Sequence, residues 1–194
     1  METTLIVSSV LLWLVVLLNL LLTFGLLRRL KADSRPLTAP QQTKLKPGEP
    51  APAFTALTVH GETVTFSTYA GRKVAFVFIL ANCAPCHQIL PELQELEPKA
   101  ARAGVELVLV SGGELEETRA LVEEEHIGLP VLVAPRSTAS FFDDYKVAGV
   151  PAYCLVNERG SIQSAGHPLQ EFEDWKTLTA SWAASDDPTL HGRR

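Results

Sequence analysis

The sequence predicts an α/β domain with a mixed central sheet and helices on its faces. Apolar segments of strand length alternate with amphipathic segments of helix length between residues 53 and 185. A C-x-x-C pair, Cys83 and Cys86, stands between one such strand and one such helix. Candidate hairpins at the start and the end of this region indicate a sheet that is mixed rather than purely parallel.

The expected strands are short, and the central ones are continuously apolar. Residues 54–59 and 63–66 are expected to pair around a glycine-containing turn. Residues 73–80, KVAFVFIL, have the composition of a strand covered on both faces. Further strands are expected at residues 105–110, 129–134, 152–157 and 161–166.

The helix that follows the cysteines is expected over residues 85–104, with leucine and isoleucine side chains on its inner face. Pro91 should kink this helix, and Gly104 should end it. Other helices are expected at residues 114–127, 137–147 and 169–184.

The N-terminal region predicts a membrane anchor. Residues 5–27 carry no charged side chain and would reach about 34 Å as a helix, enough to span a bilayer. A cleaved signal peptide is the alternative, but the basic n-region and the small-residue cleavage site that it needs are not visible. We therefore expect a transmembrane anchor at 5–27, a proline-rich tether at 28–52, the α/β domain at 53–185 and a polar tail at 186–194.

The charge pattern bears on partners and on orientation. With a net charge of -5 and no basic segment in the domain, a nucleic-acid partner is not expected. The residues after the span are basic, and by the positive-inside rule they predict a cytoplasmic domain; they are Arg28, Arg29, Lys31 and Arg35.

The letters C-A-P-C-H at residues 83–87 fit more than one chemistry. Covalent haem would use both cysteines with His87 as axial ligand, but the only methionine for a second ligand is Met1. A zinc site needs a second ligand cluster, which the sequence does not contain. Two idle buried thiols are the plainest alternative. The position between a buried strand and a helix favours a redox dithiol, with no cofactor and no metal.

The position of the two cysteines gives this preference a physical basis. Cys83 would lie at a helix N-terminus, where free backbone NH groups and the helix dipole favour a thiolate. Cys86, one turn later, could attack the sulfur of Cys83 and resolve a mixed disulfide. Pro85 fits the first turn, and His87, about 100° further around the helix, is expected to face solvent.

The segments KPGEPAPAFTALTVHGETVTFSTYAGRKVAFVFILANCAPC and AGVPAYCLVNERG resemble the thioredoxin superfamily. More narrowly, they are similar to TlpA/ResA-type and redoxin-type thiol-disulfide oxidoreductases, and the anchor-tether-domain layout resembles that of the methylamine-utilisation protein MauD. The resemblance implies a thioredoxin-like fold with an extra helix-strand unit within residues 121–156. It also implies dithiol-disulfide exchange with cysteines of protein substrates, and a redox partner.

The resemblance implies roles for individual residues. Cys83 matches the nucleophile of the family and Cys86 its resolving cysteine, so that a Cys83–Cys86 disulfide forms in the oxidised state. Pro151 matches the family's cis-proline, and Val150 would offer backbone groups to a substrate. Further substrate contacts are expected from the residues between the cysteines, Ala84 and Pro85.

The sequence departs from the family at four positions. Asn82 replaces the tryptophan before the first cysteine, and Val77 and Ile89 replace the two carboxylates that usually move the proton of the buried thiol. The direction of exchange is therefore not predicted. A peroxidase, with Cys83 attacking peroxide, is the enzyme alternative, but Leu80 replaces the threonine that positions the peroxide in peroxiredoxins.

Two expectations remain. Cys154, within the apolar run AYCLV, is interpreted as a small buried residue rather than a third redox centre. The family implies a domain outside the cytoplasm on a single-pass anchor in the cell membrane, and the basic residues after the span oppose this orientation.

Overall fold

The structure, a computed structural model, describes residues 12–14, 16–17, 19, 45–169 and 171–184. Among these residues, no helix is long and apolar enough to cross a membrane. Most of the predicted anchor at 5–27 and most of the predicted tether lie outside the described residues, and so does the predicted tail at 186–194. The chain divides into two compact units, Met1–Gln42 and Thr43–Arg194, and the second unit contains the C-x-x-C motif.

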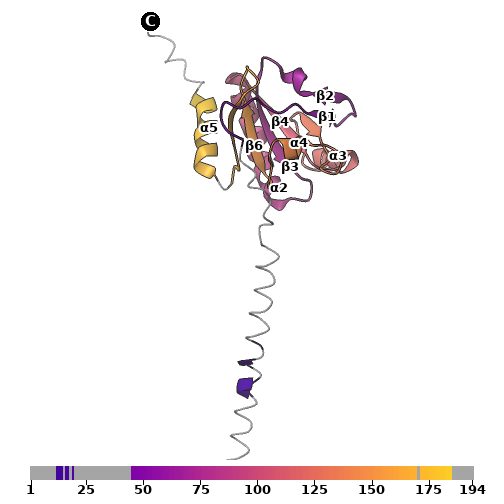
Figure 1. Ribbon diagram of the computed structural model, residues 1–194, viewed down its shortest axis with the longest axis vertical. Helices are drawn as coiled ribbons and strands as arrows, with labels where there is room; N and C mark the ends of the chain where they lie inside the picture. The colour runs from indigo at the N-terminus through magenta and orange to yellow at the C-terminus, as the bar shows by residue number, and fades with distance from the viewer. Residues whose placement is uncertain (1–11, 15, 18, 20–44, 170, 185–194) are drawn as a thin grey trace, which may run out of the picture. The chain divides into compact units, whose positions relative to one another are not determined.

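The second unit contains a seven-stranded mixed sheet in the order β2-β1-β5-β4-β3-β6-β7. Of these strands, Figure 1 labels β1, β2, β3, β4 and β6. The central strand β3 pairs in parallel with β4 on one side and antiparallel with β6 on the other. This arrangement confirms the predicted mixed sheet. The strands are β1 (Thr55–Thr58), β2 (Thr63–Thr65), β3 (Lys73–Ile79), β4 (Val105–Ser111), β5 (Val131–Val133), β6 (Ala152–Val156) and β7 (Ile162–Gly166).

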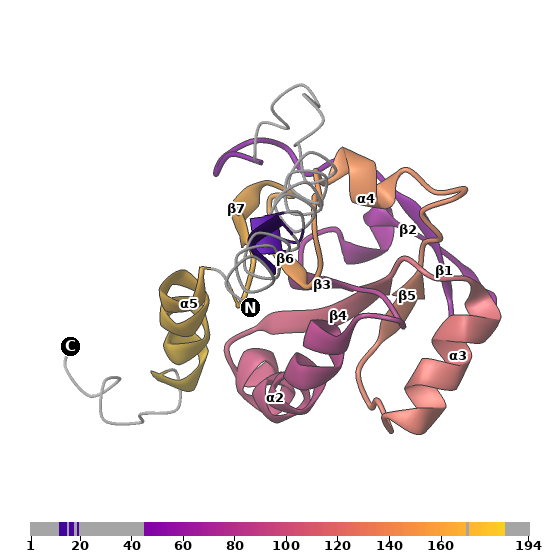
Figure 2. The same cartoon turned by 90° about the horizontal axis from the view of Figure 1, so that it is seen from below.

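Helices cover both faces of the sheet. Figure 2 shows α2, α3 and α5 on one side of it and α4 on the other. The strand β5 follows α3 and enters the sheet between β1 and β4, which places the extra helix-strand unit beside the core strands. The helices are the 3-10 helix η1 (Phe66–Tyr69) and the α-helices α2 (Ala84–Arg102), α3 (Leu115–Glu124), α4 (Phe141–Asp144) and α5 (Phe172–Ala184).

Strand β3 lies at the centre of the core because both of its faces are apolar. Its side chains alternate between the faces, and every residue from Val74 to Ile79 is at most 1% exposed. The α2 side takes Ala75, Val77 and Ile79, and the α4 side takes Val74, Phe76 and Phe78. The continuous apolar run that predicted a doubly covered strand is thereby explained.

Aromatic rings fill the core on the α4 side. Phe54 stacks on Phe141 of α4 with the ring centroids 3.9 Å apart, and Phe141 meets the edges of Phe76 and Phe78. Such pairs add about 0.5–1.5 kcal/mol each to the area they bury. The short helix α4 is therefore held by its aromatic side chains rather than by its own length.

The folded unit begins earlier than the predicted boundary at residue 53. Leu45 is buried, and Pro50 forms a β-bridge with Ser161. Backbone hydrogen bonds join Gly48 and Glu49 to Ile162. The end of the predicted tether is thus part of the domain, because its backbone groups find partners at the start of β7.

Helix α2 begins one residue before and ends two residues before the predicted bounds of 85–104. Cys83 is its N-cap residue and Ala103 its C-cap residue. The next residue, Gly104, has a φ of +72°, the left-handed conformation in which glycine ends helices at little cost. The helix contains Pro91 and Pro98 within its length.

Candidate active site

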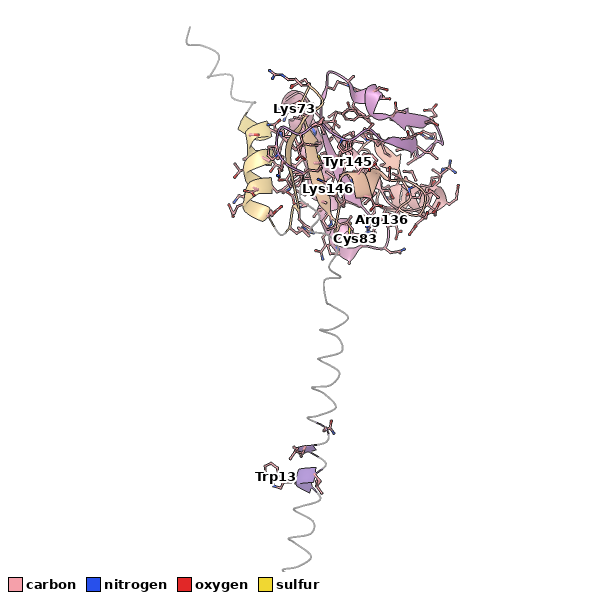
Figure 3. The ribbon with its side chains drawn as sticks, viewed as in Figure 1. Trp13, Lys73, Cys83, Arg136, Tyr145 and Lys146 are labelled. Atoms are coloured by element: carbon pink, nitrogen blue, oxygen red, sulfur yellow. A yellow bond between two sulfur atoms is a disulfide. The ribbon has the colours of Figure 1, made fainter. Side chains whose placement is uncertain are left out.

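The two cysteines lie at one end of the central strand. β3 ends at Ile79, and four residues later Cys83 begins α2. Figure 3 shows Cys83 at the end of the domain opposite to Lys73, the first residue of β3. Cys83 and Cys86 form a disulfide with their Cα atoms 5.2 Å apart. The structure therefore brings together the two residues that the motif singled out.

The two sulfur-bearing residues differ in their exposure. Cys83 is partly exposed, whereas Cys86 is 1% exposed and packs into the core from the inner face of α2. The backbone NH of Cys86 donates a hydrogen bond to Sγ of Cys83 at 3.2 Å. A donor at a helix N-terminus stabilises the negative charge of a thiolate. Of the two cysteines, Cys83 thus has both the access and the local dipole that an attacking thiolate needs.

A loop with a cis peptide bond faces the disulfide. The bond between Val150 and Pro151 is cis, as the resemblance implied. The carbonyl oxygen of Val150 lies 3.9 Å from Sγ of Cys83. Ala84 and Pro85, between the cysteines, are exposed. Exposed backbone and side-chain atoms of these two residues therefore lie next to Cys83 in the chain.

The surroundings of Cys86 are apolar. Val77 and Ile89, which stand where relatives carry acids, are buried in the same cluster as Cys86. Tyr153 belongs to this cluster and is opposite Val77 in the β3–β6 register. Burial is the main cause that raises the pKa of its phenol, so the ring stays neutral at ordinary pH. Neither of the two positions that carry the family's carboxylates provides a proton acceptor here.

His87 differs from the expectation of a solvent-facing residue. Its side chain is 34% exposed, and both of its ring nitrogens have close partners. Nδ1 lies 2.6 Å from Oε1 of Glu125 and Nε2 lies 2.6 Å from the carbonyl oxygen of Ala81. The hydrogen bond to Glu125, followed by that to Ala81, raises the pKa of His87 above its ordinary value. Glu125 is too distant in sequence for helical spacing to reveal this contact.

A second contact joins the loop before Cys83 to α3. The side-chain amide of Asn82 donates a hydrogen bond to Oε1 of Glu117 at 2.7 Å. Asn82, which replaces the family's tryptophan, therefore connects the redox loop to the first half of α3, while His87 connects α2 to Glu125, the residue that caps the other end of α3. The sequence showed the departure at Asn82 but not its partner.

Cys154 lies apart from the redox pair. It is free, buried in the core on the α4 side, and burial raises the pKa of its thiol to about 12. The interpretation of Cys154 as a small buried residue agrees with this environment. Within the part of the chain that the structure describes, no group of three His, Cys, Asp or Glu residues is arranged as a metal site.

A redox dithiol that opens a helix directly after the central strand of such a sheet defines the thioredoxin-like class of proteins. The sheet order and the cis-proline loop both agree with this class. Within it, the chain belongs to the AhpC/TSA family, whose sequence model matches residues 47–165.

Curated relatives carry names from thiol redox chemistry. The thioredoxin-like protein YneN of Bacillus subtilis is 27% identical over 126 residues, which cover 63% of this chain and 72% of the relative. The thiol-disulfide oxidoreductase ResA of Halalkalibacterium halodurans is 26% identical over 135 residues, which cover 68% of this chain and 76% of the relative. This chain has the same class of activity, thiol-disulfide exchange.

Solved structures agree on the fold. A thiol:disulfide interchange protein from Bacteroides sp. superimposes with a TM-score of 0.62 at 21% identity, covering 77% of this chain and 99% of that one. The thioredoxin domain of a thiol-disulfide oxidoreductase from Bacteroides vulgatus gives a TM-score of 0.59 at 20% identity, covering 70% and 99%. The thioredoxin-like fold predicted from the sequence is confirmed.

Proposed function

We propose that this protein is a membrane-anchored oxidoreductase in which Cys83 forms a mixed disulfide with protein substrates and Cys86 resolves it. The difference in exposure between the two cysteines carries the assignment of roles. Cys83 is partly exposed beside the carbonyl of Val150, whereas Cys86 is 1% exposed and reaches no substrate directly. The substrate sulfur therefore meets Cys83 first.

The exchange proceeds in two balanced steps. In the reductive direction, the Cys83 thiolate attacks one sulfur of a substrate disulfide. A bond forms between Sγ of Cys83 and that sulfur, the substrate's own S–S bond breaks, and the substrate thiolate that leaves takes up a proton. Cys86 then loses its proton and attacks Sγ of Cys83, which releases the second substrate thiol and forms the Cys83–Cys86 disulfide. A dithiol partner returns the two electrons, and the reverse sequence oxidises a substrate dithiol.

The cis-proline loop is proposed to bind the substrate next to Cys83. Val150 and Pro151 would present backbone groups to an extended polypeptide, and the exposed Ala84 and Pro85 would contact it from the other side. Support comes from the 3.9 Å between the Val150 oxygen and Sγ of Cys83. A substrate held in this way aligns its sulfur with the attacking thiolate.

Reduction of peroxide by Cys83 receives less support. Leu80, three residues before Cys83, is apolar and lies against Gly112, so it offers no hydroxyl to a peroxide. Purified reduced protein is therefore expected to oxidise far more slowly with hydrogen peroxide than with a protein disulfide.

The anchor and its orientation are proposed from sequence. The uncharged segment 5–27 supports a single span of the cell membrane, and the layout of similar proteins supports a domain outside the cytoplasm. The basic residues after the span favour the opposite orientation. A reporter that is active on one side only, fused after Arg194, tests the proposal; activity of a cytoplasmic reporter would overturn the orientation alone.

Trapping tests the roles of the cysteines. The full-length chain with Cys86→Ser, expressed in its native membrane, is expected to accumulate mixed disulfides through Cys83, because the resolving attack is lost. The matched variant Cys83→Ser should trap none. Mixed disulfides that form equally with Cys83→Ser, or with neither variant, would refute the assignment.

A further inference from the structure

The ring of His87 lies between two groups that can only accept hydrogen bonds. One is the backbone carbonyl of Ala81, 2.6 Å from Nε2, and the other is the carboxylate of Glu125, 2.6 Å from Nδ1. A neutral imidazole has a single NH and can donate to only one of them. Both contacts are satisfied only when the ring carries two protons, so the geometry selects the imidazolium.

This ring connects three parts of the redox site. His87 stands in the first turn of α2, and its backbone NH donates to the carbonyl oxygen of Cys83 at 3.1 Å. Ala81 is in the loop that leads to Cys83, and Glu125 caps the end of α3. Through one side chain, the loop that carries Cys83 is fixed to the helix that follows it and to the neighbouring helix.

We propose that His87, as an imidazolium held by Glu125 and Ala81, is a positioning residue that fixes the loop before Cys83 and favours the Cys83 thiolate. This inference rests on the proposed role of Cys83 as nucleophile. The positive ring adds to the helix N-terminus, which already favours a negative sulfur. The carboxylate of Glu125 offsets part of that charge, so the effect on Cys83 is expected to be modest.

The charges around the ring decide its titration. From α3 it is faced by Glu125 and Glu124, both of which raise its pKa above the ordinary 6.5. The loop contributes the Ala81 carbonyl and the uncharged amide of Asn82, which holds the carboxylate of Glu117. On its own helix, Cys83 and Cys86 are joined in the disulfide and do not titrate in this state. The imidazolium contacts are therefore complete at low pH and are lost as pH rises through the raised pKa of His87.

The thiolate effect is measured by alkylation of Cys83 in the full-length chain carrying Cys86→Ser. Iodoacetamide rates are compared between about pH 5 and about pH 9, with and without His87→Gln or Glu125→Gln. Below the pKa of Cys83, His87→Gln is expected to slow alkylation roughly two- to fivefold, the size of a partly exposed charge interaction. Glu125→Gln leaves the ring charged near pH 5, so its slowing is expected only at higher pH, where its ring has lost the proton that the parent ring still holds. The difference should shrink at high pH, where the unsubstituted ring loses its proton as well.

The matched control is Glu123→Gln, which removes the same charge from an exposed position near the end of α3. It should leave the alkylation profile unchanged. Superimposable profiles for His87→Gln and its parent would overturn the proposal, and so would an equal slowing by Glu123→Gln.

A measurement on the unsubstituted ring covers the case in which a variant fails to fold. NMR titration of His87 is expected to give a pKa above 6.5, which returns toward that value in Glu125→Gln. A pKa at or below 6.5 in the parent would overturn the proposal. Failure of the proposed function gives a different result from failure of the His87 proposal. If Cys83 is not the nucleophile, Cys83→Ser keeps its exchange activity, and this outcome does not depend on the residue at position 87.

Discussion

Placing an acid at Val77 tests how apolar the surroundings of Cys86 are. Val77 is 0% exposed, its backbone lies between β4 and β6, and its side chain shares a cluster with Cys86. A carboxyl introduced by Val77→Asp would lie in this apolar cluster without a polar group positioned to hydrogen-bond it. Burying it in neutral form costs roughly 1–3 kcal/mol by protein mutational data.

Ionisation makes the cost depend on pH. Burial should raise the pKa of the new carboxyl by about three units above its unfolded value of about 3.9. Each unit costs about 1.4 kcal/mol once the unfolded chain is ionised. Because the folded pKa is the higher one, this added cost is absent below about pH 3.9 and is complete above about pH 7. The total reaches about 5–7 kcal/mol, comparable to the whole stability of a small domain.

Urea unfolding of residues 43–194, followed by fluorescence of the buried Trp175 and Trp182, measures this loss near pH 5 and near pH 8. Val77→Asn is the control, because it has the polar cost without the ionisation. Val77→Asp should lose stability relative to Val77→Asn as pH rises. If the two variants keep the same difference at both pH values, Val77 does not lie in a medium of low polarity.

Three further predictions concern other parts of the domain. In the folded reduced protein, Cys154 should resist iodoacetamide at pH 8 while Cys83 reacts, because burial raises the pKa of the Cys154 thiol to about 12. Mass spectrometry should find Cys154 labelled only after unfolding. Phe141→Ala should lower the free energy of unfolding by about 3–5 kcal/mol, as urea titration would show, since its ring stacks on Phe54 in the core; a loss below about 1 kcal/mol would contradict this packing. Gly104→Ala should cost about 1 kcal/mol in the same assay through its left-handed φ of +72° alone, because nothing lies within 4 Å of an added Cβ.

Most of the elements followed from local pattern. Strand β3 and helix α2 begin and end within one or two residues of their predicted bounds, because a doubly apolar strand and a glycine-ended helix are strong local signals. The start of the domain, by contrast, could not be predicted from local pattern. Residues 45–52 have no apolar period, and they join the fold through backbone hydrogen bonds to residues 160–162, which sequence patterns do not register.

Some features of the candidate site could likewise be predicted from local sequence, and others could not. The C-x-x-C spacing and the helix start sufficed to select Cys83 and Cys86, because both signals lie within one turn of chain. The cis bond at Pro151 followed only from family resemblance, since most X-Pro bonds are trans. The partners of His87 and Asn82 on α3 are more than thirty residues away in sequence, and no local pattern indicates them.

The sequence by itself determined which segments become strands and helices and which sulfur atoms can exchange, because these properties depend on neighbours within a few residues. The tertiary structure alone decided that Cys86 is buried while Cys83 is accessible, and that His87 lies between Ala81 and Glu125. Burial and hydrogen bonds act over a few ångströms in space. They are therefore set by how the chain folds back on itself, and they turn a C-x-x-C-H motif into an asymmetric redox pair beside a histidine with contacts at both ring nitrogens.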